Sequence, residues 1–141
     1  MEARPGAANL AAAWWMIGAG MAGGAVLGMW SFGGPVAPPA GFAAYDDLPR
    51  RLLRLAHIAC VMLPVLNLLY VPGIRRSRWG PGLRRKACAL LLFGTVALPA
   101  LLALAAAWPP ALWSLPLPVT ALILSCFLLA AGVAGRRREA A

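Results

Sequence analysis

His57 is the side chain of this sequence best suited to chemistry, because it is an imidazole within a long apolar stretch. At helical spacing, Arg54 and Asn67 fall near the same face of that stretch. A polar side chain at such a depth in a membrane usually faces protein or water and has a partner. The interpretation we favour is a structural histidine bonded to a backbone carbonyl or a hydroxyl. The sequence predicts no resident cofactor; if one is bound, His57, Arg54 and Asn67 are the candidate residues, and haem or quinone is the candidate group.

The other reactive side chains restrict the chemistry further. A haem held by two histidines of this chain is excluded, because the chain has one histidine. Proton-driven transporters usually need a carboxylate within the membrane, and the four acids lie outside the apolar stretches, at Glu2, Asp46, Asp47 and Glu139. The cysteines form no C-x-x-C pair and stand at Cys60, Cys88 and Cys126. We therefore predict no metal site and no catalytic residues, and we expect no enzyme.

The glycines of the first apolar stretch suggest packing rather than nucleotide binding. Residues 18–23 match G-x-G-x-x-G, but a dinucleotide site needs a strand before the glycines and a helix that begins at them. Gly20, Gly24 and Gly28 are spaced by four and form a smooth stripe on a helix, which lets another backbone approach closely. We predict that this stripe packs against a helix of the same chain, with a dimer contact as the alternative.

Four apolar stretches must position these groups. Hydrophobic residues make up 62% of the 141 residues and charged residues 12%, which is about half the usual charged share of a soluble domain. Each stretch is continuously apolar and long enough for a membrane-spanning helix, for which about 20 residues are needed. We predict an all-α integral membrane protein, with residues 1–141 forming one domain, an up-down bundle of four transmembrane helices. The expected spans are Leu10–Phe32, Leu52–Val71, Ala87–Ala107 and Leu117–Ala134.

The basic residues predict the orientation of these spans. The connection from Pro72 to Lys86 has no acid and carries Arg75, Arg76, Arg78, Arg84, Arg85 and Lys86. With four spans, Arg4 and residues 136–138 fall on the same side. By the positive-inside rule this side is cytoplasmic, so both termini are expected in the cytoplasm. We expect the six connection residues to meet anionic lipid headgroups in a bacterial cytoplasmic (inner) membrane.

The functional prediction follows from this layout. We expect a small polytopic protein that acts as a non-catalytic subunit or assembly factor of a larger membrane complex. Its partners would be the lipid bilayer and other membrane subunits or further copies of the chain, and no nucleic acid. One alternative is a haem- or quinone-interacting redox subunit that uses His57. The other is a small-solute carrier or channel, with helix kinks at Pro64 and Pro99 lining a wet cavity.

Overall fold

The computed structural model describes residues 6–31 and 33–139, and within α4 it describes side chains up to Gly135. The described chain is all-helical. Four of its helices are long and apolar enough to cross a membrane, as the sequence predicts. The elements in chain order are α1 (Ala7–Met29), α2 (Leu48–Arg75), α3 (Pro81–Ala107), the short 3-10 helix η1 (Pro109–Ser114) and α4 (Pro116–Glu139).

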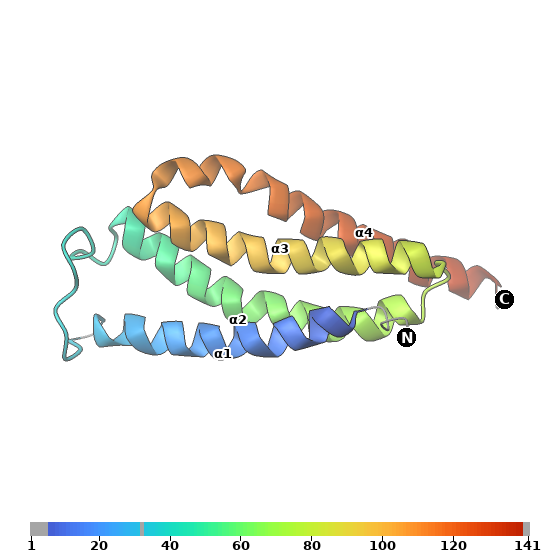
Figure 1. Cartoon of the computed structure of the whole chain (residues 1–141), viewed down its shortest axis with the longest axis horizontal. Coiled ribbons are helices and arrows are strands. Elements are labelled where there is room, and N and C mark those ends of the chain that lie inside the picture. The colour runs from blue at the N-terminus through green and yellow to red at the C-terminus, as the bar shows by residue number, and fades with distance from the viewer. Residues whose placement is uncertain (1–5, 32, 140–141) are drawn as a thin grey trace.

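The helices pack mainly on their neighbours in sequence. In Figure 1 consecutive helices run in opposite directions, and α1 and α4 lie on opposite sides of the α2–α3 pair. Helix α1 packs chiefly on α2, α2 on α3, and α3 on α4, whereas the described parts of α1 and α4 are not in contact. The bundle is therefore open along one side, where α1 and α3 meet only weakly.

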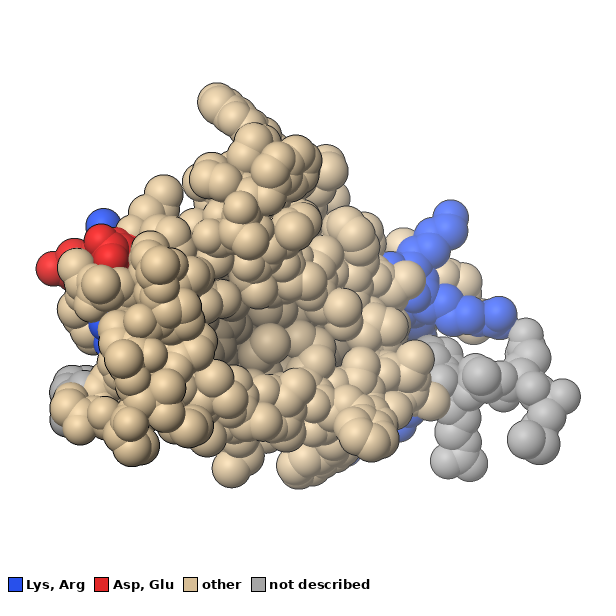
Figure 2. All heavy atoms as spheres, turned by 60° about the vertical axis from the view of Figure 1, so that its left-hand side comes forward, with Lys and Arg blue, Asp and Glu red and all other residues tan. Residues whose placement is uncertain are grey.

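The outer surface of the helices is apolar. Large side chains such as Trp15, which is 81% exposed, and Phe127, which is 69% exposed, point away from the protein. A continuous apolar surface of this kind would aggregate in water but suits lipid. Figure 2 shows an uncharged band between one end that carries both acidic and basic residues and another end that carries basic residues.

The first helix ends earlier than the sequence predicts. The expected span runs to Phe32, which lies outside the described residues, but α1 ends at Met29. The amide of Ser31 bonds the carbonyl of Gly28 at 3.1 Å, and that of Gly34 bonds the carbonyl of Ser31 at 2.9 Å. Gly33 then takes a left-handed φ of 73°, which turns the chain away from the helix axis.

The basic connection is shorter than the expected segment from Pro72 to Lys86. Helix α2 continues through Pro72 to Arg75, and α3 begins at Pro81, so residues 76–80 alone join them. Pro81 stands at the start of α3, where its missing N–H costs nothing. Arginine and lysine are good helix formers, so Arg84, Arg85 and Lys86 extend the helix beyond its apolar part.

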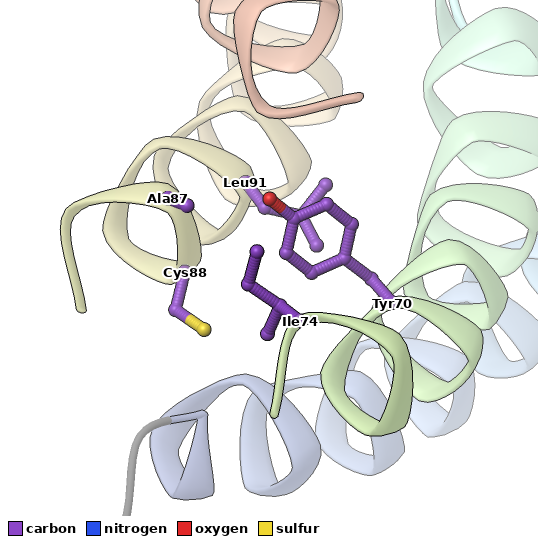
Figure 3. Close-up of a cluster of buried hydrophobic side chains, with 5 residues drawn as sticks. All are labelled: Tyr70, Ile74, Ala87, Cys88 and Leu91. Carbon is purple, nitrogen blue, oxygen red and sulfur yellow. The ribbon is translucent and has the colours of Figure 1, made fainter. Parts of the chain in front are cut away.

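Apolar contacts hold α2 against α3 near the basic end. Figure 3 shows Tyr70 and Ile74 of α2 meeting Ala87, Cys88 and Leu91 of α3. The Tyr70 hydroxyl donates a hydrogen bond of 2.8 Å to the carbonyl of Ser125. This bond joins α4 to the α2–α3 pair. A second buried cluster lies at the opposite end of the bundle and comprises Leu52, Ala105, Ala106 and Ala111.

Buried amides connect three helices towards the basic end of the bundle. Asn67 of α2 is fully buried. Its Oδ1 accepts a hydrogen bond of 2.8 Å from Nδ2 of Asn9, and its Nδ2 donates to Oγ1 of Thr95 at 2.7 Å. Asn9 also donates to the carbonyl of Cys88 at 2.8 Å. The network links α1, α2 and α3 through three buried side chains, whose hydrogen bonds are therefore made within the protein.

This network yields a stability prediction. We expect Asn67→Ala to lower the free energy of unfolding in detergent micelles by about 1–3 kcal/mol, because it leaves buried groups without partners. In a double-mutant cycle with Asn9→Ala, the coupling should be about 0.6 kcal/mol, typical of hydrogen bonds between membrane helices. Denaturant titrations followed by circular dichroism measure both values. Unchanged stability of Asn67→Ala would contradict this account of the amide network.

Candidate functional site

The most prominent candidate site is a groove between α1, α2 and α3, called here the lateral groove. Its volume is about 510 Å³, within the usual range for ligand pockets. Its lining contains no charged side chain and consists of Met16, Ala19, Gly20, Gly23, Val26, Leu27, Trp30, Leu53, Ala56, His57, Cys60, Val96, Pro99, Ala100 and Ala103. It lies towards the end of the bundle that carries the α1–α2 connection.

His57 is the principal polar side chain of the lateral groove. Its Nδ1 lies 2.8 Å from the carbonyl oxygen of Gly20. A carbonyl oxygen only accepts hydrogen bonds, so Nδ1 must carry the proton and donate. Nε2 has no hydrogen-bond partner among the described residues. The bond to the carbonyl agrees with a structural role for His57. The ring also lines the groove, however, and its Nε2 is available to bond a ligand.

Two glycines of the predicted stripe make room for this arrangement. A Cβ added at Gly20 would lie 2.7 Å from Cγ2 of Val61, so α1 and α2 approach closely there. A Cβ at Gly24 would overlap the imidazole of His57. The third glycine, Gly28, has no such neighbour within 4 Å in the described structure. Close helix approach therefore involves Gly20 and Gly24.

Arg54 points to the α1–α2 connection. Its Nη1 donates to the carbonyl of Tyr45 at 2.7 Å, and its guanidinium carbon lies 3.7 Å from the centre of the Tyr45 ring. A guanidinium over an aromatic face is favourable. Arg54 is not part of the groove lining, so its charge is turned towards the end of the bundle.

Asn67 also lies apart from His57. It belongs to the buried amide network and does not line the lateral groove. The structure therefore does not bring His57, Arg54 and Asn67 together: their hydrogen bonds go to three separate sets of partners. Asn67 lies ten residues from His57, about 15 Å along the helix axis. Arg54 is only one turn from His57, but its side chain turns away to Tyr45.

Arg50 has a structural role that the sequence did not reveal. Its side chain is only 6% exposed and donates to the carbonyl of Trp30 at 2.6 Å and to that of Ala43 at 3.2 Å. Trp30 caps the end of α1, where the helix dipole favours a positive charge. Arg50 thus fastens the start of α2 to the end of α1. No sequence pattern marks unpaired carbonyls at a helix end as its partners.

The six predicted headgroup residues lie at the opposite end of the bundle. All except Arg84 are exposed, and they are Arg75, Arg76, Arg78, Arg84, Arg85 and Lys86. Arg84 is half-buried and donates to the carbonyl of Ser77 at 2.6 Å. Arg78 lies over the Trp79 ring at 4.7 Å from its centre. Arg4 lies outside the described residues, and so do the side chains of residues 136–138.

The cysteines are dispersed. Cys60 lines the lateral groove, Cys88 is buried between α2 and α3, and Cys126 is exposed on α4. Within the described residues, no three His, Cys, Asp or Glu side chains are grouped as a metal site would require. Thiols so placed act as small apolar side chains.

The contact between Gly24 and His57 is directly testable. We expect Gly24→Ala to displace the imidazole and lower the free energy of unfolding by about 1–3 kcal/mol, as overpacking typically does. The matched control is Gly28→Ala, which has open space around its Cβ and should be neutral or stabilising by up to about 1 kcal/mol, since alanine favours helix. Denaturant unfolding in micelles distinguishes them. Equal effects would contradict the described packing.

Comparisons with known proteins do not add an assignment to this geometry. No protein-family model, no curated protein and no solved structure matches the chain. The lateral groove, the His57–Gly20 bond and the cluster of basic residues at one end of the bundle are therefore the observations from which function is argued.

Proposed function

We propose that the chain is a non-catalytic subunit or assembly factor of a larger membrane complex. The observation that carries this proposal is the lateral groove, an apolar hollow that the chain's own helices leave unfilled. Much of the polar chemistry within the helices supports packing, because Asn9, Asn67 and Tyr70 all bond across helices. Such a scaffold is suited to binding another membrane component.

The proposed setting is the inner membrane of a bacterium, crossed four times in an up-down arrangement with both termini in the cytoplasm. Arg75, Arg76, Arg85 and Lys86 are exposed at one end of the helices, whereas Asp46 and Asp47 precede α2 at the other. Positive residues are retained on the cytoplasmic side. Anionic headgroups would attract the basic end by about 1 kcal/mol for each charge near the surface.

A second candidate function has a specific observation in its favour. His57 lines the lateral groove with Nε2 unbonded among the described residues, and a nitrogen with a free lone pair is suited to a haem iron or to a hydroxyl of a reduced quinone. The chain would then be a redox subunit that binds a cofactor with His57, without help from Arg54 or Asn67. An absorption spectrum of the purified protein tests the haem form directly.

The orientation is tested by labelling single cysteines. In a variant with the three native cysteines replaced by alanine, Ala40→Cys and Gly80→Cys place a thiol at exposed positions of the first and second connections. A membrane-impermeant maleimide applied to intact spheroplasts should label Ala40→Cys and leave Gly80→Cys unlabelled until the membrane is permeabilised. The reverse pattern would contradict the proposed orientation.

The subunit proposal is tested by isolating the chain from its native membrane in mild detergent. We expect a particle larger than the 14.7 kDa chain with its micelle, containing other membrane proteins or further copies in fixed ratio. Light scattering gives the particle mass, and mass spectrometry identifies its components. A lone monomer without a co-purifying chain would contradict the proposal.

A further inference from the structure

We propose that the lateral groove binds the reduced, hydroquinone form of a lipid-soluble quinone, with a ligand hydroxyl donating a hydrogen bond to Nε2 of His57. This inference rests on the proposed function, because it names the membrane component that the same groove receives. It is argued from the hydrogen-bonding state of one imidazole, the composition of the groove lining and the space beside Gly23.

The His57–Gly20 bond determines what the ligand must offer. A neutral imidazole has one N–H, and the Gly20 carbonyl requires that proton on Nδ1. In this neutral form Nε2 carries a lone pair and accepts. Leaving an acceptor unpaired in an apolar site is unfavourable, so the complementary ligand atom is a donor. The oxygens of an oxidised quinone only accept, whereas a hydroquinone hydroxyl donates.

The rest of the lining requires an uncharged ligand. None of the lining residues is charged, and the nearby guanidinium of Arg54 is bound to Tyr45. An anionic phospholipid head would therefore lose its hydration without gaining a partner. A hydroxyl on an apolar ring meets both requirements, since it is neutral and supplies one donor.

The groove also has the width for a ring. Small residues line it on each of its three helices, including Gly23, Ala56 and Ala100. A Cβ at Gly23 would meet no described atom within 4 Å, so this glycine borders open space. The volume of about 510 Å³ accommodates a substituted ring with part of its tail.

The test uses the full chain in nanodiscs of synthetic phosphatidylcholine, which contain no quinone. The probe is a tritiated benzoquinone with a decyl tail, presented oxidised or kept reduced by excess dithionite, and binding is measured at equilibrium. We expect the reduced probe to bind at least about ten-fold more tightly than the oxidised probe, the difference that one well-formed hydrogen bond produces.

Two variants and one control locate the site. His57→Phe removes the acceptor but keeps an aromatic ring, and it should abolish the preference for the reduced probe. Gly23→Leu fills the groove without contacting described atoms at its Cβ, and it should lower affinity about ten-fold or more. Gly28→Leu makes the same change at a glycine of α1 outside the groove lining, and it should bind like the parent.

Several results would overturn this inference. Equal binding of the two redox forms, or a preference that survives in His57→Phe, would show that Nε2 does not select a donor. Equal competition by diacylglycerol would show that a hydroxyl lipid of another class fits. A Soret band shifted from that of free haemin in the parent, but not in His57→Phe, would show that a porphyrin occupies the groove. If Gly23→Leu released a co-purifying protein while the parent bound no probe, a partner helix would be the occupant, and the proposed subunit function would stand without this inference.

Discussion

The arrangement of this protein depends on one constraint: a polar group between lipid-facing helices must find its hydrogen-bond partner within the protein. Asn67 illustrates it most directly, because this fully buried amide is bonded to Asn9 on α1 and to Thr95 on α3. Apolar contacts alone let two helices in a membrane rotate and slide against each other, because lipid tails are as apolar as leucine side chains and an apolar surface can pack on either. A directional bond does not, so the amides fix how three helices are turned towards one another.

The same constraint fixes the register of α1 against α2 at three positions along the two helices. Arg50 holds the carbonyl that ends α1, His57 holds the carbonyl of Gly20, and Asn67 holds the amide of Asn9. All three are residues of α2, which is therefore the reference for the bundle. The lateral groove is a consequence: α1 is bound to α2, while its contact with α3 stays weak and leaves a hollow between them.

The positions of the helices could be predicted from the sequence, whereas the face that each helix turns to its neighbours could not. The length of the apolar stretches was enough to predict four spans, because about 20 consecutive apolar residues without acids are typical of a transmembrane helix. Helix α1 ends three residues before the expected end of the first span, since the left-handed turn at Gly33 is not visible in hydropathy. The site residues were harder to group. Helical spacing puts Arg54, His57 and Asn67 near one face. In the structure, however, Arg54 bonds the carbonyl of Tyr45 in the α1–α2 connection, and Asn67 bonds side chains of other helices. Periodicity within one helix identifies none of these partners.

The central claim is that the Gly20 carbonyl holds His57 with its proton on Nδ1, which leaves Nε2 as an acceptor in the lateral groove. Because the chain has one histidine, nitrogen NMR of protein labelled with ¹⁵N-histidine in lipid bilayers reads this residue without assignment. The account predicts one protonated resonance correlated to Hδ1 and one unprotonated resonance for Nε2 at neutral pH in quinone-free lipid. A proton on Nε2 with a bare Nδ1 would contradict it.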